Sequence, residues 1–212
     1  MGFPHRLADS DKRRRQGMNC VNRMNPSWAA LLAAPGVVLI VPAPVLGGQS
    51  YLHEADAARA IFSESTASTR RKLELSDAEV AALSKALGRR VDARSYPYLE
   101  VRSEKGTVGF IFMLDVIGES LPITFAIGVT ADGALQDVQV MVYREPQGEA
   151  IQEKRFRKQF VGKRSKDPIT LDKDIDAISG ATISSRSATF AARKGLLLAE
   201  VVRGRASAGS KP

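Results

Sequence analysis

The chain has 212 residues, 44% of them hydrophobic and 25% charged, a size that suits one globular domain with an additional segment. It carries 31 Lys and Arg against 23 Asp and Glu, and this formal charge of +8 is typical of proteins that bind nucleic acid or a membrane surface. With one cysteine, Cys20, and two histidines, His5 and His53, the sequence excludes an intrachain disulfide, a His/Cys zinc cluster and iron–sulfur ligation. Its chemistry must therefore use oxygen ligands, hydroxyl groups or an organic cofactor.

A basic segment precedes an apolar run near the N-terminus. Residues 12–15 read Lys-Arg-Arg-Arg, and no charged side chain occurs between Met24 and Leu52. This order is typical of an export signal, with a cleavage site at residues 45–47, although the apolar run also has about the ~20 residues that cross a bilayer. We therefore predict that residues 1–48 are an export signal or an N-terminal membrane anchor. The remaining chain is then periplasmic, either free or anchored to the inner membrane and facing the periplasm.

Half of the net positive charge belongs to this segment. Residues 1–48 hold six of the 31 basic and two of the 23 acidic side chains, which leaves a net charge of +4 on the rest of the chain. Export and this lower charge both argue against nucleic acid as a partner.

Residues 49–94 are expected to form a helical extension. Apolar residues at spacings of three and four predict a helix over residues 52–63. A second helix begins at Ser76, where Ser76 and Glu79 form a capping box, and it ends at Gly88. The Ser- and Thr-rich residues 63–71 between the two helices are expected to be a polar linker.

The apolar period then changes to two, which predicts strands. The expected strands cover residues 96–101, 107–116, 123–129 and 138–142. Asp132-Gly133 between the last two is a strong hairpin signal, so the strands form an antiparallel sheet with one face on a core.

A turn at residues 144–148 leads to an expected helix in which Phe156 and Phe160 lie one turn apart. Residues 154–166 hold seven cations and no acid, and they form either a solvated helix face or a docking surface for a phosphate or an acidic partner. The last helix is expected over residues 185–202, with Gly204 as its end and residues 205–212 as a disordered tail. Strands followed by a flanking helix predict an α+β domain over residues 95–204.

The segment that enters the last helix contains the best candidate for chemistry, Asp176-Ala-Ile-Ser-Gly-Ala-Thr182. Gly180 allows a tight turn, and the amides at a helix N-terminus suit a phosphate. Thr182 and Ser185 offer hydroxyl groups at this end. Alternatively, these residues only cap the helix.

The pattern Asp-x-x-Ser-Gly-Ala-Thr resembles the flavinylation motif of the FMN-binding domain family, which includes the FMN-carrying subunits of sodium-pumping NADH:quinone reductase and of Rnf-type complexes. Residues 123–133, 143–148, 159–163 and 174–182 are similar to small periplasmic members in order and spacing, so the resemblance covers about residues 95–202. In this family a flavin transferase uses FAD to attach FMN, through its phosphate, to the last threonine of the motif. That threonine corresponds to Thr182.

The resemblance implies an α+β domain whose antiparallel sheet packs against helices. The predicted FMN site consists of Thr182 with Asp176, Ser179, Gly180, Ala181, Ser185, Glu145, Gly148 and Lys163, and it includes no metal ligand and no catalytic residue. The larger subunits have Glu-Thr-Pro-Gly where this chain has Glu145-Pro-Gln-Gly148, so a hydroxyl is missing from this turn. The resemblance still allows the backbone of Gly148 to contact the flavin.

The function implied is that of an exported electron-transfer flavoprotein, an electron carrier or a subunit of a redox system rather than a stand-alone enzyme. Its expected partners are a flavin transferase during maturation, redox proteins such as haem or quinone-reactive membrane proteins, and the membrane itself. The alternative is a membrane-anchored binding or scaffold module of the same fold with non-covalent flavin or none.

Overall fold

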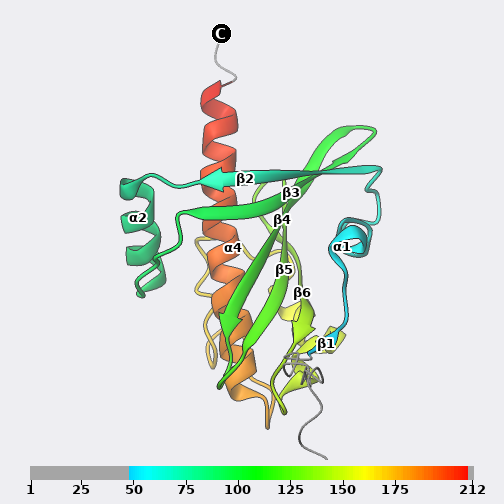
Figure 1. Cartoon of the computed structure of the whole chain (residues 1–212), viewed down its shortest axis with the longest axis vertical. Coiled ribbons are helices and arrows are strands. Elements are labelled where there is room, and N and C mark those ends of the chain that lie inside the picture. Colours follow the sequence, from blue (N-terminus) through cyan, green and yellow to red (C-terminus); the bar gives the residue numbers. More distant parts are fainter. Residues whose placement is uncertain (1–47, 210–212) are drawn as a thin grey trace, which may run out of the picture. The chain divides into compact units, whose positions relative to one another are not determined.

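One antiparallel sheet of six strands, in the order β1-β6-β5-β4-β3-β2, organises the computed structural model, which describes residues 48–209 (Figure 1). The strands are β1 (Gln49–Ser50), β2 (Ala67–Glu74), β3 (Ser95–Ser103), β4 (Gly106–Ile117), β5 (Pro122–Thr130) and β6 (Leu135–Tyr143). The α-helices are α1 (Glu54–Ile61), α2 (Asp77–Leu87), α3 (Lys154–Arg157) and α4 (Thr182–Gly209), and the 3₁₀ helices are η2 (Glu149–Gln152) and η3 (Lys158–Phe160). The predicted α+β class is therefore confirmed.

Local signals predicted several elements well. Strands β3 to β6 lie where the period of two placed them, and the β5–β6 hairpin turns at Asp132-Gly133, where Gly133 has a φ of 89°. The capping box of α2 forms as expected, because the Glu79 N–H donates to Ser76 Oγ (3.3 Å) while the Glu79 carboxylate accepts from the Ser76 N–H (2.8 Å). Gly88 ends this helix in a left-handed conformation.

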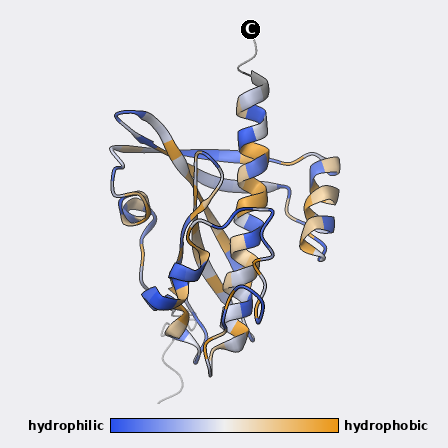
Figure 2. Ribbon diagram, turned by 180° about the vertical axis from the view of Figure 1, so that it is seen from behind, coloured by the Kyte–Doolittle hydropathy of each residue, from blue (hydrophilic) through white to orange (hydrophobic). Residues whose placement is uncertain are grey.

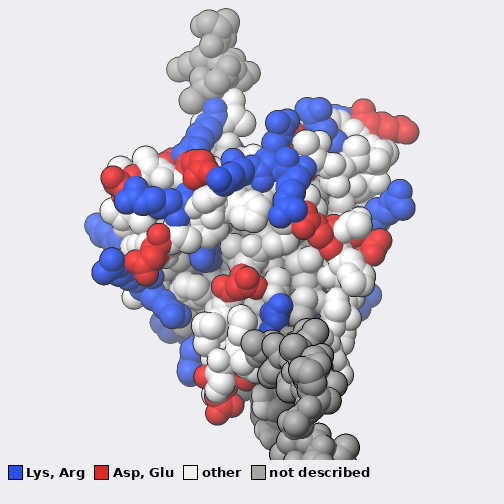
Figure 3. Space-filling view, in the orientation of Figure 1, with Lys and Arg blue, Asp and Glu red and all other residues white. Residues whose placement is uncertain are grey.

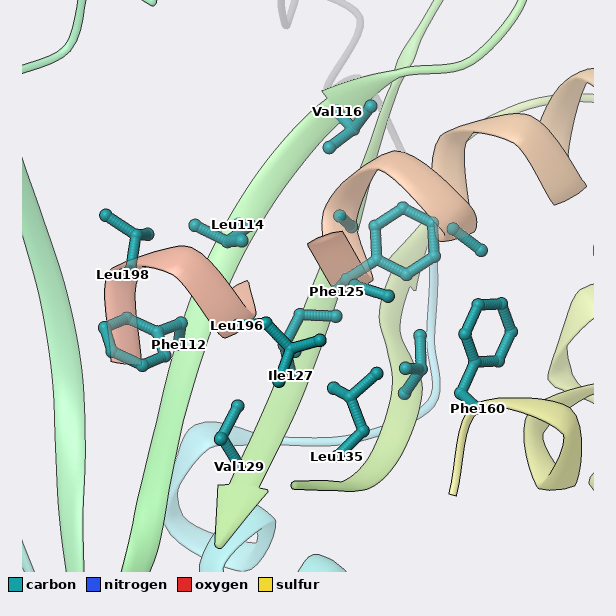
Figure 4. Packing of buried hydrophobic residues seen from close by; sticks show 14 of the residues in the cluster. Phe112, Leu114, Val116, Phe125, Ile127, Val129, Leu135, Phe160, Leu196 and Leu198 are labelled. Carbon is teal, nitrogen blue, oxygen red and sulfur yellow. The ribbon is translucent and has the colours of Figure 1, made fainter. Parts of the chain in front are cut away.

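The larger core lies between the sheet and α4. Figure 4 shows Leu196 and Leu198 of α4 close to side chains of β4 and β5, with Phe160 at the side of the same cluster. The close approach depends on Gly195, because a Cβ there would lie 2.5 Å from the Ile127 side chain. Small residues on α4 thus allow the helix to pack directly on the sheet, as the sequence predicts.

The second face of the sheet is also covered, which the expectation of a single core face missed. Helix α1 and Phe62 pack there in a smaller apolar cluster with residues such as Val101 and Ile111. This contact depends on glycines in the central strands: a Cβ at Gly109 would lie 2.4 Å from the Phe62 ring, and one at Gly128 would lie 2.3 Å from Ile61.

The expected polar linker over residues 63–71 is wrong, because residues 67–74 form the edge strand β2. Its residues pair with β3 from Ala67 opposite Arg102 to Glu74 opposite Ser95. Only Leu73 of this strand is buried, and Figure 2 shows its ribbon as mostly hydrophilic, so the alternation that indicates a strand is absent. The segment 49–94 thus contributes strands β1 and β2 to the sheet as well as two helices.

The charged side chains of β2 suit its edge position. Lys and Arg gather along the part of the surface formed by this strand (Figure 3), and Arg71 and Lys72 pair with Glu100 (3.2 Å) and Glu74 (2.6 Å). Charges on an edge strand disfavour pairing with another sheet.

Helix α4 exceeds its predicted limits at both ends. It begins at Thr182 rather than Ser185 and continues through Gly204 to Gly209, so residues 205–209 are not the disordered tail that was expected. A glycine inside a helix costs only about 1 kcal/mol. Here Arg203 and Arg205 hold the last turns, donating to the Ala131 carbonyl (3.0 Å) and to the Glu79 carboxylate (2.7 Å) respectively.

The predicted helix around Phe156 and Phe160 is shorter than expected, because it consists only of α3 and η3. Both phenylalanines are buried, with ring centroids 5.3 Å apart. In the part of the chain that the structure describes, no helix is both long and apolar enough to span a membrane. The predicted export segment, with Cys20, and residues 210–212 lie outside the described residues.

Candidate functional site

Thr182 is the first residue of α4, and its side chain is exposed. The loop before it turns sharply at Gly180, whose φ of 77° confirms the predicted use of glycine at this position. The N–H of the buried Ala181 donates to the Ile178 carbonyl (2.9 Å), which closes the turn and leaves Thr182 at its outer side.

A cavity of about 220 Å³ lies beside Thr182. It is bounded by the turn after β4, the turn after β6 and the start of α4, and its lining residues are Glu119, Glu145, Gln147, Gly148, Gly180, Ala181, Thr182, Ile183 and Ser184. The fold therefore brings together five of the predicted site residues: Glu145, Gly148, Gly180, Ala181 and Thr182.

The turn after β6 is attached to α4 through Tyr143. The Tyr143 phenol lies 2.8 Å from Ser184 Oγ in the first turn of α4, and it also donates to the Gln147 carbonyl. Burial raises the pKa of Tyr143, although the hydrogen bond with Ser184 acts in the opposite direction, so the phenol stays protonated at neutral pH. Gly148 fits below this pair with a φ of 92°, and a Cβ there would lie 2.6 Å from Ser184 Oγ.

Glu145, in the same turn after β6, also lines the cavity and holds the β4–β5 turn. Its side chain is buried, and Oε1 accepts hydrogen bonds from the N–H groups of Ser120 (2.7 Å) and Leu121 (2.8 Å). A Cβ at Gly118 would lie 2.6 Å from the same oxygen, so a side chain there would displace the Glu145 carboxylate. Through these two hydrogen bonds, Glu145 Oε1 therefore has a structural role in the wall of the cavity.

Two further serines fix the start of α4. Ser185 is fully buried, and its hydroxyl accepts from the Ile178 N–H (3.3 Å) in the preceding loop. Ser187 Oγ donates toward the Ile117 carbonyl (3.0 Å) at the end of β4. Ser185 thus supports the loop from inside, and its hydroxyl does not line the cavity.

Asp176 and Ser179 line a separate cleft of about 500 Å³ on the other side of the motif. The Gln159 side chain clamps the backbone of Asp176 there: its Oε1 accepts from the Asp176 N–H (2.7 Å), and its Nε2 donates to the Asp176 carbonyl (3.2 Å). The carboxylate of Asp176 is exposed. The first half of the motif is therefore held by its backbone, which leaves this side chain open to a partner.

Lys163 does not line the cavity, because its ammonium group pairs with Asp174 (2.9 Å). The same carboxylate accepts from the N–H groups of Ile169 (3.1 Å) and Thr170 (2.8 Å). Burial acts to raise the pKa of Asp174, but these hydrogen bonds and Lys163 lower it overall. Lys163 thus stabilises the loop before the motif.

More than half of the cations in the basic run over residues 154–166 are paired with acidic side chains. Four of its seven cations form ion pairs, with distances of 2.6 Å for Arg155–Glu153 and 2.7 Å for Arg157–Asp137. Arg164 pairs with Asp132 of the β5–β6 hairpin. The pairs of Arg157 and Arg164 therefore connect this segment to β6 and to the β5–β6 hairpin, which is a structural role.

The chemistry available beside Thr182 is that of a hydroxyl group at a helix N-terminus. The first amides of a helix have no acceptor within it, and the helix dipole adds a partial positive charge, so this end favours an anion. Over residues 48–209 no three His, Cys, Asp or Glu side chains lie close enough together to hold a metal ion. The site is therefore suited to a phosphate that is held by backbone amides and a hydroxyl.

Comparison with known proteins identifies this region. The sequence model of the family described as FMN-binding domain matches residues 118–197, which include both walls of the cavity, the motif and the first half of α4. The match over these residues supports a flavin-binding protein with FMN as its cofactor. A search of curated proteins gave no significant match.

Several residues of the site were not predicted from the sequence. Tyr143 lies inside one of the segments that carried the resemblance and Ser184 lies two residues beyond another, but their contact joins positions 41 residues apart and has no local signal. Glu119 and Ile183 enter the cavity wall through the β4–β5 turn and the first turn of α4. Only the tertiary structure brings these residues to one place.

Proposed function

We propose that this chain is an exported electron-transfer flavoprotein that carries FMN covalently, through its phosphate, on Thr182. The observation that carries this proposal is the position of Thr182. Thr182 is the first residue of a 28-residue helix, and its exposed hydroxyl lies beside a cavity of about 220 Å³. The surrounding residues match the FMN-binding domain.

The residues around Thr182 fit a phosphodiester. The helix N-terminus supplies free amides and a partial positive charge. Gly180 carries no side chain, and a Cβ there would meet no atom within 4 Å, so the approach to the hydroxyl is open. The nearby carboxylate of Glu145 is turned by its backbone hydrogen bonds toward the β4–β5 turn, which limits its repulsion of an anion.

Attachment uses Thr182 as a nucleophile once, during maturation. A bond forms between Thr182 Oγ1 and the phosphorus of the FMN half of FAD, while the pyrophosphate bond breaks and AMP leaves. The hydroxyl proton passes to a base of the flavin transferase, which also supplies the metal. This division of roles needs only an accessible hydroxyl on the substrate protein, and Thr182 offers one.

Bound FMN supplies one- and two-electron transfer, and the protein supplies position and surroundings. The long helix α4 and the Tyr143–Ser184 contact keep the attachment point rigid relative to the sheet. Such a rigid attachment suits a carrier that passes electrons between partner proteins better than an enzyme with its own substrate pocket.

The proposed location and partners rest on the N-terminal sequence. A basic segment followed by an apolar run suits export with or without anchoring, and a covalent bond prevents loss of the flavin outside the cytoplasm. We propose redox proteins at the membrane, carrying haem or reacting with quinone, as the electron partners.

The decisive experiment is coexpression of the full chain with a flavin transferase, followed by a denaturing gel viewed under ultraviolet light. The wild type is expected to fluoresce and to gain the mass of FMN less one water, whereas Thr182→Ala is expected to do neither. Thr66→Ala, which changes another exposed threonine, serves as the matched control and is expected to be labelled.

A dark wild-type band, or a fluorescent Thr182→Ala band, would overturn covalent attachment at this residue. A yellow native protein whose colour is lost on denaturation would indicate non-covalent FMN, and a colourless protein would favour the scaffold alternative. Fractionation of cells that express the full chain tests export, which predicts the protein in the periplasm or the inner membrane.

A further inference from the structure

The ladder between β3 and β4 stops before β4 ends. Its last pair at this end is Tyr98 opposite Phe112, whereas β4 continues to Ile117 and stays paired with β5. The next residue of β3 toward this end is Pro97, which has no N–H group to donate. Residues 113–117 therefore have a strand on one side only, and Figure 1 shows β3 and β4 diverging there. We call these residues the β4 edge.

Two residues of the β4 edge direct their backbone polar groups away from β5. The turn after β4 is closed by a hydrogen bond from the Gly118 N–H to the Leu121 carbonyl (2.9 Å). Because hydrogen-bonded pairs alternate along an antiparallel ladder, the N–H and carbonyl groups of Asp115 and Ile117 point outward. Ser187 Oγ donates to the Ile117 carbonyl (3.0 Å). The two N–H groups and the Asp115 carbonyl therefore have no strand to pair with.

A hollow of about 210 Å³ lies along the β4 edge. Its walls are residues 89–93 of the loop after α2, residues 115–117 of β4, and Phe190 and Lys194 of α4. Figure 3, in the orientation of Figure 1, shows Lys and Arg side chains gathered near the lower end of α2. The backbone groups of the edge and several cations thus border the same space.

Arg89 and Lys194 bring positive charge to this hollow. The Lys194 ammonium lies 4.7 Å from the centroid of the Tyr96 ring. Burial, and then the charge of Arg89, lower the pKa of Lys194, while Asp115 raises it. Over residues 48–209, neither Arg89 nor Lys194 forms an ion pair with a carboxylate. A partly buried cation without a counter-ion is unfavourable, so an anionic group in the hollow is stabilised.

The other charges at the hollow do not offset these two cations. Arg90 pairs with Asp92 (2.7 Å), so the two together contribute no net charge. Asp115 is exposed, and its carboxylate accepts a hydrogen bond from the Thr124 hydroxyl (2.6 Å) on β5. Two cations thus remain beside one acid that is directed toward the neighbouring strand, and this balance favours an acidic ligand.

We propose that the β4 edge and this hollow bind an extended acidic segment of a partner protein, which adds a strand to the sheet. The edge supplies the backbone hydrogen bonds of strand addition, and Arg89 and Lys194 supply the complementary charge. The inference does not depend on FMN, because no residue of the hollow lines the cavity beside Thr182.

The surroundings of the edge define the kind of segment that fits. Side chains of an added strand alternate between the two faces of the sheet. An acid on the face toward α4 meets Arg89 and Lys194. Val116 is buried in the core under α4, so Asp115 and Ile117 project from the other face, where Ile117 is 55% exposed. An apolar side chain suits Ile117, and Asp115 repels a second acid. The expected segment therefore alternates acidic and apolar residues.

The experiment titrates the full chain, purified in detergent, into a fluorescently labelled peptide of three Glu-Val repeats at low salt. Fluorescence anisotropy gives the dissociation constant. One control peptide has Lys-Val repeats, and a second has the Glu-Val sequence with all backbone amides N-methylated. The protein variants are Arg89→Gln and Lys194→Gln. Lys105→Gln is their matched control, because Lys105 is an exposed lysine in the turn at the opposite end of β4.

We expect the Glu-Val peptide to bind and the Lys-Val peptide not to bind. N-methylation should abolish binding, because it removes the donors of the ladder. Arg89→Gln and Lys194→Gln should each weaken binding about fivefold, whereas Lys105→Gln should leave it unchanged. Bound peptide should also slow hydrogen exchange at the amides of Asp115 and Ile117. Thermal unfolding verifies that each variant is folded.

Absence of binding by the Glu-Val peptide at low salt would overturn the proposal. Equal weakening by Lys105→Gln would overturn it as well, since the attraction would then come from the overall charge of the protein. Equal binding of the N-methylated peptide, or inorganic phosphate that binds as tightly as the peptide, would show a simple anion site and exclude strand addition.

Discussion

Tyr143 and Ser184, which are 41 residues apart in the sequence, place their hydroxyl groups 2.8 Å from each other in the protein interior. This contact joins the end of β6 to the first turn of α4. It therefore fixes the geometry of the cavity in which Thr182 lies, since Gly148 and Gln147 of one wall are held by the same phenol.

Removing this phenol is expected to destabilise the site measurably. Tyr143→Phe leaves the buried Ser184 hydroxyl without its partner and should lower the free energy of unfolding by about 1–2 kcal/mol. Urea unfolding of Tyr143→Phe, Ser184→Ala and the double variant gives the coupling between them. Strictly additive effects would show that the two hydroxyl groups act independently.

Gly148 is expected to tolerate no side chain. Its φ of 92° disfavours any other residue, and an alanine Cβ would lie 2.6 Å from Ser184 Oγ and 2.8 Å from Tyr143 Oη. Gly148→Ala should therefore cost more than about 2 kcal/mol of stability. Gly162→Ala is the control, because its φ of 82° is similar but no atom lies within 4 Å of the added Cβ. If calorimetry shows that Gly148→Ala and Gly162→Ala lose the same free energy of unfolding, crowding at Gly148 is not the cause.

Glu145 is expected to act through its hydrogen bonds to the β4–β5 turn. Glu145→Ala leaves the Ser120 and Leu121 N–H groups without an acceptor and should cost about 2 kcal/mol, whereas Glu145→Gln keeps a carbonyl oxygen in place and should cost less. Amide hydrogen exchange at Ser120 and Leu121 measures the effect locally. Equal exchange in both variants would exclude this role.

The contact between Glu79 and Arg205 predicts a pH dependence of stability. Hydrogen bonds from Arg205, and then those from Ser76, lower the Glu79 pKa from 4.5 to about 2. A carboxylate with a lowered pKa stabilises the fold above its unfolded pKa, and this contribution is lost as the pH falls from about 4.5 toward 2. Since the groups are largely solvated, we expect about 1 kcal/mol.

Glu79→Gln is the variant that tests this dependence. It should be less stable than the wild type at pH 7, and the difference should shrink between pH 4.5 and about 2 in chemical unfolding curves. A difference that stays constant over this range would mean that the capping geometry, rather than the charge of Glu79, provides the stability.

Features of the fold that depend on neighbouring residues could be predicted from the sequence. The capping box at Ser76 and Glu79 and the turn at Gly133 lie where expected, because each depends on the conformational preference of a few adjacent residues. Strand β2 could not be predicted in this way. It is polar on both faces, and β3 beside it is what makes it a strand.

By itself, the sequence determined the α+β class, the central strands and the motif with Thr182 at its end, since apolar period and short turn signals are local properties. Only the tertiary structure decided the length of α4, because Arg205 reaches Glu79 across the fold. It also decided which motif residues share the cavity: Gly180 and Thr182 line it, whereas Asp176 and Ser179 lie in another cleft and Lys163 pairs with Asp174. Side chains from distant strands and turns set these positions, and their packing has no signature at any single place along the chain.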